Sequence, residues 1–331
     1  MKNDANGISA AKRLRFWLEA GALRTLTWLI PKFPRRGVLR LGRMLGWLVY
    51  HVATEQRRVA LANLDVAFGD TKTSAQKKQI ALVSTQNFVT TMLGLFWSPR
   101  LTRDSVNQFI EFEPESLRFA REVVGRSKGV IGITMHYGDW EMLGLGLGFY
   151  GLPMTVVQEA TTNPAIGEIL GQLRGASGNR VISNHRAAVK LIKSIRQNEI
   201  IGVLADQHIA RREGGVWVNF FGLPVSNTPA VGWLALRTGA PIVIFAARPL
   251  PDGRRQIYCV AELPYDIQDE SEAAAQAINQ QCMELCEAAI RKEPELWLWS
   301  YKRWKSRPTR ERGRFPYYSR TSRIDVPDAT D

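Results

Sequence analysis

The chain has 331 residues, 45% of them hydrophobic, and its formal net charge is +13. That length and apolar content supply ample core for one large domain or two small ones. The three Cys residues form neither a CxxC pair nor a His/Cys ligand set, which excludes a disulfide framework and fits a reducing compartment. With no internal repeat and no Ser/Gly-rich linker, the sequence predicts one domain with an N-terminal helical extension.

The positive charge lies at the two ends of the chain. Residues 1–60 hold 12 Lys and Arg against 3 Asp and Glu, and residues 301–331 hold 9 against 4, so residues 61–300 carry a net charge of −1. Trp and Tyr are interleaved with these cations, a pattern typical of segments that bind an anionic membrane surface. A solvated basic face would explain the Arg but not the Trp. No zinc-finger spacing, RNP-like strand or basic recognition helix accompanies them, which argues against nucleic acid.

The N-terminal end is predicted to associate with a membrane. Two amphipathic segments, at about 12–30 and 36–54, fit helices that lie in the membrane interface. No stretch near the N-terminus reaches the ~18–20 uninterrupted apolar residues of a confident spanning helix. No small-residue cleavage site follows a compact apolar core, so this segment is expected to be retained.

The rest of the chain alternates between strand-like and helix-like patterns. Residues 73–97 are predicted to form a helix capped by Thr73 or Ser74. Strands are predicted at 129–135, 153–158, 200–205, 216–221, 241–247 and 254–261. Helices are predicted at 139–150, 163–175, 185–197, 228–238 and 270–292, the last with Cys282 and Cys286 as packing residues. This alternation indicates an α/β layered fold with a mixed, largely parallel sheet flanked by helices.

The stretch from His136 to Glu141, H-Y-G-D-W-E, is the main candidate for catalysis. It follows an apolar run and precedes an apolar helix, so His136 is expected at a strand end and Glu141 in the first helical turn. One ring nitrogen of His136 could then bond the Glu141 carboxylate while the other faces substrate. Strand ends in open α/β sheets are where ligands bind. The alternative interpretation is a packed or surface His beside an ordinary acid at a helix start.

This motif of His, four residues and Glu resembles that of the lipid A biosynthesis (late) acyltransferases, a branch of the broader glycerolipid acyltransferase group. Other blocks that resemble this family occur in order along the chain, at 57–64 before this motif and at 204–207, 220–224, 235–241 and 303–305 after it. The similarity runs from about residue 15 to 308, and the ordered set is far more specific than the His–Glu pair alone. It implies the acyltransferase α/β sandwich. The family commonly has an N-terminal membrane helix, and residues 16–31 depart from a clean one.

In the reaction that the resemblance implies, an acceptor hydroxyl attacks an acyl thioester. The hydroxyl has a pKa far above 7, so neutral His136 would serve as general base. Glu141 would fix the tautomer of His136 and stabilise its protonated form. Backbone amides of residues 138–140 would stabilise the oxyanion, with Gly138 allowing close approach. The thioester is already activated, so no Ser or Cys nucleophile is required.

Further residues are assigned to the substrate. Arg174 falls where the family places a required arginine, and it could hold a phosphate of the acceptor or help to stabilise the oxyanion. Arg180 is its rival, and a surface Arg is the plain alternative. Asp206 and Gln207 follow a predicted strand, and Asp206 is expected to orient Arg174 or the substrate, or to make an ordinary turn. Asp139 is interpreted as a helix N-cap rather than a second catalytic acid.

The sequence therefore predicts a membrane-associated acyltransferase of lipid A and lipopolysaccharide biosynthesis, at the cytoplasmic face of the bacterial inner membrane. The donor would be an acyl carrier protein or acyl-CoA, the acceptor a phosphorylated glycolipid, and neither metal nor other cofactor is expected. The predicted division is a membrane-associating segment at 1–55, an acyltransferase domain at 56–308 and a flexible basic tail at 309–331. The alternatives are another glycolipid or a phospholipid as acceptor, and a non-catalytic lipid-binding protein of the membrane surface. A metal hydrolase is disfavoured because no second His lies near His136 in the sequence.

Overall fold

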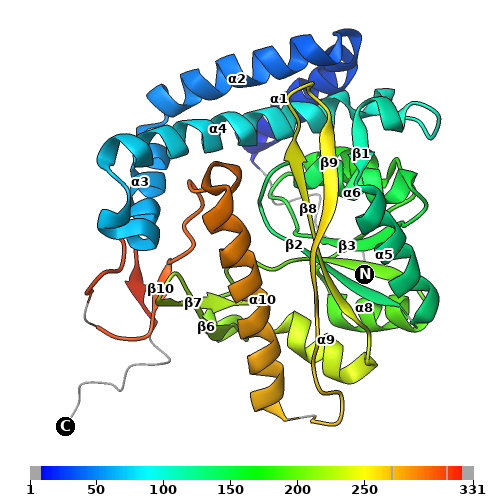
Figure 1. Ribbon diagram of the computed structural model, residues 1–331. Helices are drawn as coiled ribbons and strands as arrows, with labels where there is room; N and C mark the ends of the chain where they lie inside the picture. Colours follow the sequence, from blue (N-terminus) through cyan, green and yellow to red (C-terminus); the bar gives the residue numbers. More distant parts are fainter. Residues whose placement is uncertain (1–8, 128, 270, 311, 323–331) are drawn as a thin grey trace.

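A mixed seven-stranded sheet forms the centre of the molecule (Figure 1). The structure, a computed structural model, describes residues 9–127, 129–269, 271–310 and 312–322. In sheet order the strands are β1 Ile110–Phe112, β9 Arg255–Leu263, β8 Ile242–Pro249, β2 Val130–Thr134, β5 Ile200–Leu204, β3 Met154–Gln158 and β4 Arg180–Ser183. The five strands from β8 to β4 are parallel, whereas β9 runs antiparallel to β8 and pairs in parallel with β1.

Helices cover both faces of this sheet. One face packs against α5 Pro114–Arg126, α6 Trp140–Phe149 and α7 Pro164–Gly175, and the other against α8 Ala187–Arg196, α9 Ala230–Thr238 and α10 Glu272–Lys292. Successive strand residues alternate between the two cores, so Ile131 and Ile133 contact the α8–α10 side while Val130 belongs to the α5–α7 side. Because both faces are covered, the strands read as continuous apolar runs in the sequence.

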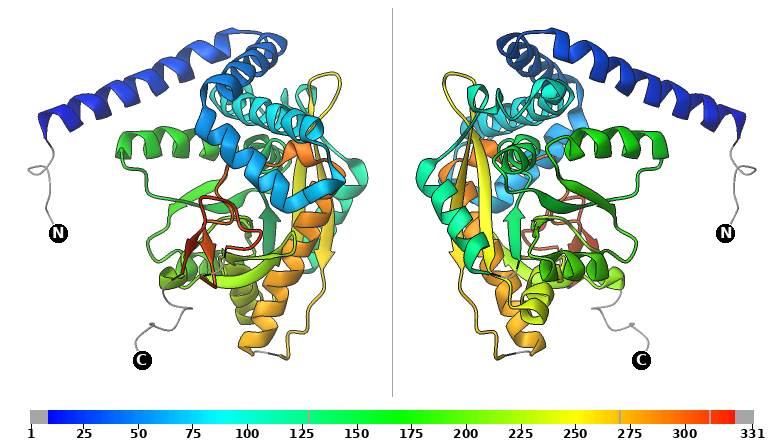
Figure 2. Two further views of the ribbon diagram at one scale, coloured as in Figure 1. Left: turned by 90° about the vertical axis from the view of Figure 1, so that its left-hand side faces the viewer. Right: turned by 90° about the vertical axis from the view of Figure 1, so that its right-hand side faces the viewer.

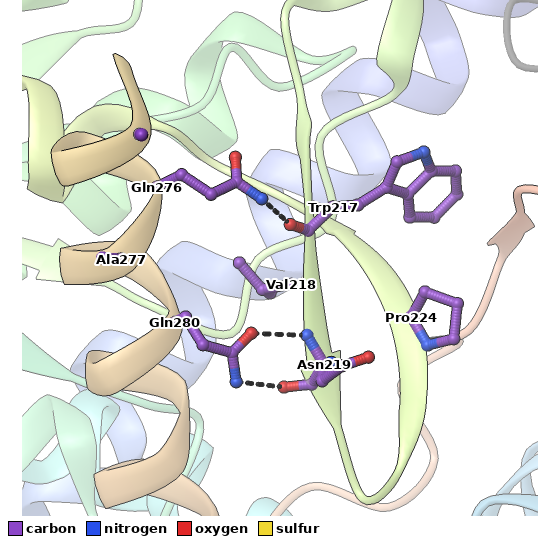
Figure 3. Close-up of a pocket in the computed structure, with 8 residues that line it drawn as sticks. Trp217, Val218, Asn219, Pro224, Gln276, Ala277 and Gln280 are labelled. Carbon is purple, nitrogen blue, oxygen red and sulfur yellow. Dashed lines mark hydrogen bonds between the residues drawn. The ribbon is translucent and has the colours of Figure 1, made fainter. Parts of the chain in front are cut away.

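A separate hairpin lies against α10. Its strands β6 Val216–Phe220 and β7 Leu223–Asn227 pair antiparallel, outside the main sheet. The side-chain amide of Gln280 accepts from the Asn219 N–H (2.7 Å) and donates to the Asn219 carbonyl (3.3 Å), and Gln276 donates to the Trp217 carbonyl (Figure 3). These glutamines satisfy the exposed edge of β6, which would otherwise present unpaired backbone groups.

Four helices precede the sheet: α1 Ala10–Leu29, α2 Arg35–Val52, α3 Thr54–Phe68 and α4 Ser74–Trp97. α2 lies along α4, and β-carbons added at Gly42 and Gly46 would clash with the α4 backbone at Thr90 and Gln86. α1 contacts α7 and extends beyond the body of the protein (Figure 2). The functional division at residue 55 remains a prediction, but α2 shares its packing with α4 rather than standing apart.

One helical stretch among the described residues, Ser74–Arg100, is long and apolar enough to cross a membrane by length and composition. It comprises α4 and the 3₁₀ turn after it, and 44% of its most apolar window is buried within the protein. A buried core helix passes the same test, so this stretch is weak evidence for a membrane span. The other short 3₁₀ helices are Ile30–Lys32, Gly69–Thr71, Val106–Gln108, Arg211–Glu213 and Pro294–Leu296.

The mixed, mostly parallel α/β sheet flanked by helices is confirmed, and every predicted strand and helix has a counterpart. The hairpin strand at 216–221 exists but does not join the main sheet. Cys282 and Cys286 are buried and free, as predicted for packing residues. The flexible tail expected at 309–331 differs from the structure over residues 312–322, where β10 Ser306–Arg307 pairs with β11 Arg320–Thr321 and the Tyr318 hydroxyl bonds Asn63 of α3. Residues 323–331 lie outside the described part of the chain.

Candidate active site

The register of two neighbouring strands brings His136 and Asp206 together. β2 and β5 are parallel, with Thr134 opposite Leu204 at their carboxyl ends. His136 and Asp206 each lie two residues beyond these positions, and the Ala205 N–H donates to the Thr134 carbonyl (2.8 Å), which extends the pairing. The two side chains therefore meet at the carboxyl ends of the parallel strands, which is where α/β proteins bind ligands.

Asp206 holds His136 by both its ring and its backbone. Nδ1 of His136 lies 3.0 Å from Oδ1 of Asp206, and the His136 backbone N–H donates to Oδ2 (3.0 Å). Nε1 of Trp297 also donates to Oδ2 (2.8 Å), and the Leu298 N–H donates to the His136 carbonyl (2.9 Å). Asp206 is buried, whereas 22% of the His136 side chain is exposed. A carboxylate only accepts hydrogen bonds, so it fixes the proton on Nδ1 and leaves Nε2 as the acceptor nitrogen.

The electrostatics of the pair agree with this geometry. Burial acts to lower the pKa of His136, but the charge and hydrogen bond of Asp206 outweigh it, so the pKa is raised above its ordinary value. Burial acts to raise the pKa of Asp206, yet its contacts with His136 and Trp297 outweigh it and the pKa is lowered. Asp206 is therefore ionised and stabilises a protonated His136.

Glu141 does not bond His136, which corrects the expected pairing. It lies in the first turn of α6 and forms a two-pronged ion pair with Arg174 of α7, with Nε–Oε2 at 2.9 Å and Nη2–Oε1 at 2.5 Å. Asp206, rather than Glu141, is the carboxylate that accepts the hydrogen bond from the His136 ring, through Nδ1. The charge of Glu141 still raises the pKa of His136, while that of Arg174 lowers it. The three groups are thus electrostatically linked without a direct hydrogen bond between His136 and Glu141.

Arg174 lies in this site, and Arg180 does not. Besides its bonds to Glu141, Arg174 donates from Nη1 to Oε1 of Gln158 at the end of β3 (3.1 Å). Three of its five N–H groups are therefore engaged within the protein, and its side chain is 29% exposed. Arg180 instead bonds Glu199, 2.5 Å away. Asp206 was expected to orient Arg174 or the substrate, but its described partners are His136 and Trp297.

Gln207 lies beside the same strand end. Its Nε2 donates to Oε2 of Glu159 (3.3 Å), the residue that follows β3. Gln207, Gln158 and Glu159 therefore form a polar group next to the His136–Asp206 pair, since β3 and β5 are neighbours in the sheet. These side chains could form hydrogen bonds with a polar acceptor substrate. The assignment of Gln207 to substrate binding stays a prediction.

The turn between His136 and α6 is fixed by backbone contacts. Asp139 caps α6 by accepting from the Met142 N–H (3.2 Å), as predicted, and its other oxygen bonds Nε of Arg255 (2.7 Å). Gly138 has φ +59°, and a β-carbon there would clash with the Ala247 carbonyl of β8. Glycine is therefore required by close approach to the sheet, not by approach of a substrate.

The same contacts correct the expected oxyanion site. The Gly138 N–H donates to the Leu296 carbonyl (2.8 Å) and the Asp139 N–H to the Ala247 carbonyl (3.0 Å), so both amides are already engaged. Of the expected stretch 138–140, the Trp140 amide at the start of α6 remains the candidate donor. The Trp140 ring also contacts the His136 ring edge-on, with centroids 5.2 Å apart, and so forms an aromatic wall of the site.

The described residues form no metal site, and the pocket in Figure 3 carries no acid–base group. No group of three His, Cys, Asp or Glu side chains is placed to hold a metal ion within them. The pocket in Figure 3, between β6 and α10, is lined by Trp217, Val218, Asn219, Pro224, Ala273, Gln276, Ala277 and Gln280, none of which is an acid, base or nucleophile.

Comparison with known proteins adds independent evidence. Residues 5–306 match the model of a family described as bacterial lipid A biosynthesis acyltransferase. The chain is 25% identical over 309 residues to the lipid A biosynthesis lauroyltransferase of Escherichia coli strain K12, which covers 89% of this chain and 93% of that protein. It is 26% identical over 313 residues to the lipid A biosynthesis acyltransferase of Haemophilus influenzae, covering 90% and 93%. It is 23% identical over 306 residues to the lipid A biosynthesis palmitoleoyltransferase of Escherichia coli strain K12, covering 90% and 94%.

Proposed function

Because the chain belongs to the bacterial lipid A biosynthesis acyltransferase family and is an acyltransferase, we propose that it moves a fatty acyl chain from a thioester to a hydroxyl of a lipid A precursor, with His136 as general base. The observation that carries this proposal is the His136–Asp206 bond of 3.0 Å at the sheet edge, which leaves Nε2 as the proton acceptor. The thioester is that of an acyl carrier protein or of CoA.

In the proposed reaction, Nε2 of His136 removes the proton of the acceptor hydroxyl as its oxygen attacks the thioester carbonyl carbon. A C–O bond forms, and the carbonyl oxygen becomes an oxyanion for which the Trp140 amide is the proposed donor. When the oxyanion collapses, the C–S bond breaks, and the leaving thiolate accepts from Nε2 the proton that came from the acceptor hydroxyl. Asp206 stabilises His136 while it is charged. The step needs no metal, nucleotide or other cofactor, because the thioester supplies the driving force, so activity should survive a chelator.

Glu141 and Arg174 are proposed to shape the site beside this base. Their ion pair joins the start of α6 to α7 and places a carboxylate within electrostatic reach of His136. Two N–H groups of Arg174 remain for the substrate, and a phosphate of the acceptor is a ligand with which arginine forms strong charge-assisted bonds. Gln207 is proposed to contact the polar part of the same acceptor.

The protein is proposed to act at the cytoplasmic face of the inner membrane. Of 15 exposed large apolar side chains among the described residues, 11 lie between Leu14 and Val52, on α1, α2 and the turn between them. Trp17 and Trp28 are 68% and 64% exposed, and Arg24 lies between them in the sequence. Aromatic and basic groups together favour a bilayer interface with anionic lipids.

Substitution tests this membrane proposal better than truncation does. Removal of residues 1–52 would strip α2 from α4, so loss of folding would obscure loss of binding. Trp17→Ser with Trp28→Ser should lower co-sedimentation with anionic vesicles, whereas Trp233→Ser, at a 38% exposed Trp of α9, should not. Unchanged sedimentation of the double variant would show that α1 does not contribute to membrane binding.

The catalytic proposal is tested by mass spectrometry of lipids from cells with and without the gene, followed by assay of purified protein. His136→Ala should abolish transfer, at least about 10²–10⁴-fold, the range for a general base. The fold should persist, because one partly exposed side chain is removed, and thermal unfolding checks this. Wild-type turnover by the variant would refute the mechanism. Transfer to a neutral glycolipid or a phospholipid, but not to a lipid A precursor, would favour the alternative acceptor, and lipid binding without transfer the non-catalytic alternative.

A further inference from the structure

A basic surface lies at the C-terminal end of the described chain. Lys302, Lys305, Arg310, Arg312, Arg314 and Arg320 are all exposed there, and we call them the C-terminal basic surface. Lys302 pairs with Glu55 of α3 at 3.1 Å. Among the described residues, Lys305, Arg310 and Arg320 form no salt bridge, so their charges are available to a partner.

This surface begins at the catalytic histidine. The ring of Tyr301, the residue before Lys302, lies 5.9 Å from the His136 ring between centroids. The Tyr301 hydroxyl accepts from the backbone N–H of His208 (2.8 Å), two residues after Asp206. Oγ of Ser306 in β10 lies 3.5 Å from Nε2 of His208. A molecule held on this surface would therefore lie next to the base.

The backbone that carries these cations is held in place by strand pairing and by contacts with α3. β10 pairs with β11, with Ser306 opposite Arg320, and the Arg320 N–H donates to the Lys305 carbonyl (2.9 Å). Arg314 donates to the Val66 carbonyl of α3 (2.9 Å). The Tyr317 hydroxyl bonds Glu55 (3.0 Å), and Arg58 of α3 stacks 3.9 Å above its ring. These contacts order the backbone that carries the charges, which reduces the ordering cost of binding a partner.

The character of the surface differs from that of α1 and α2. None of the exposed large apolar side chains among the described residues lies between positions 301 and 322. Figure 2 shows α1 and α2 at the top of the molecule, with the C-terminal segment well below them. A charged surface without apolar anchors, away from the apolar helices, fits a soluble acidic protein better than a bilayer.

We propose that the C-terminal basic surface docks an acidic acyl carrier protein and presents its thioester to His136. This inference rests on the proposed function, and it assigns a docking surface to the carrier-protein form of the donor. Charge complementarity of this kind raises the association rate and falls with ionic strength. Six exposed cations spread over residues 302–320 exceed what the phosphates of a CoA molecule need, whereas an acidic protein face can engage them together.

The test compares two triple charge reversals in the full-length protein, each assayed with an acyl carrier protein thioester and with acyl-CoA. The test variant reverses three cations that form no salt bridge among the described residues: Lys305→Glu, Arg310→Glu and Arg320→Glu. The matched control reverses three exposed cations of α5 and α8: Arg118→Glu, Lys193→Glu and Arg196→Glu. We expect the test variant to raise KM for the carrier donor at least about tenfold and to flatten its salt dependence. Its kcat/KM for acyl-CoA should stay within about twofold of wild type, and the control should match wild type with both donors.

Titration calorimetry of the acyl carrier protein with each full-length protein measures binding directly. It separates the docking proposal from the proposed acyltransferase function. Wild type that binds the carrier but transfers no acyl group to phosphorylated glycolipid would refute the proposed function and leave the docking surface intact. Equal KM and binding in test variant and wild type would overturn the docking proposal. So would equal losses in test and control variants, or equal losses with both donors. Loss of binding to anionic vesicles, with carrier binding unchanged, would assign the surface to the membrane instead.

Discussion

Two buried carboxylates lie beside the same histidine and differ in what holds them. Asp206 is 70 residues from His136 in sequence, yet it bonds the ring and the backbone of that residue. Glu141 is five residues away, yet its two oxygens bond Arg174 of another helix. The comparison teaches that strand register, rather than proximity in sequence, determines which carboxylate bonds His136. We therefore propose that Asp206 sets the protonation of His136, and that Glu141 and its partner Arg174 shape the site and its electrostatic field.

Among substitutions at the groups around His136, Asp206→Asn is expected to have the largest effect. The amide can still accept from the His136 N–H and from Trp297, but its NH₂ group then faces Nδ1 of His136. Nδ1 must become an acceptor, so the proton moves to Nε2 and blocks the base. Activity should fall by about 10²–10⁴-fold. Steady-state assays with thermal unfolding measure this, and Asp65→Asn, at an exposed carboxylate paired with Lys77, is the control.

The pH profile of this variant sharpens the assignment. Asp206 raises the pKa of His136, and the base works only when neutral, so wild-type activity should fall as pH drops through that raised pKa. In Asp206→Asn the charge is gone, and the acid limb of its residual activity should move to lower pH. An acid limb unchanged from wild type would show that Asp206 does not set the protonation of the base.

Glu141→Gln should have the next largest effect, a loss of roughly 10²-fold. The variant removes a charge that helps to raise the pKa of His136 and leaves the Arg174 cation with a weaker partner. Its acid limb should therefore shift in the same direction as that of Asp206→Asn, since one negative charge is lost in each. Glu199→Gln, which breaks the equivalent ion pair with Arg180, is the matched control. If Glu199→Gln lost as much activity as Glu141→Gln, the effect would be structural rather than local to the base.

The hydrophobic pattern predicted the central strands because each is a run of apolar residues covered on both faces. It did not predict β1 or β4, which have only three and four residues and lie at the edges of the sheet, where burial leaves a weaker signal. The helices α3 and α5 were also missed. His136 and Glu141 were selected from local spacing and a family motif. The Asp206–His136 bond was missed because it depends on which strands are neighbours in the sheet, and the sequence does not give that order. Both residues do follow predicted strands, and those strands prove to be adjacent and parallel.

Arg174→Lys should have the smallest effect of the series, and it separates charge from geometry. Lysine keeps the positive charge beside Glu141 but loses the planar fork that makes two bonds to Glu141 and one to Gln158. We expect a loss of about tenfold, the equivalent of one charge-assisted hydrogen bond of about 1.5 kcal/mol. Arg174→Ala should cost more, because it leaves a buried carboxylate unpaired. KM for a phosphorylated acceptor should rise more than KM for the donor if the free N–H groups of Arg174 bind phosphate.

The matched variant for this last prediction is Arg180→Lys, since Arg180 forms an ion pair of the same length with Glu199 and has no described contact with the His136 site. Kinetics of Arg174→Lys and Arg180→Lys, each with acceptor varied at saturating donor and then the reverse, distinguish the models. Equal increases in both KM values for Arg174→Lys would indicate that Arg174 acts only through Glu141. Combination of Arg174→Lys with Glu141→Gln should then cost less than the sum of the two, because residues of one ion pair share the interaction that each substitution removes. Additive losses would separate Arg174 from Glu141 and assign it to the acceptor.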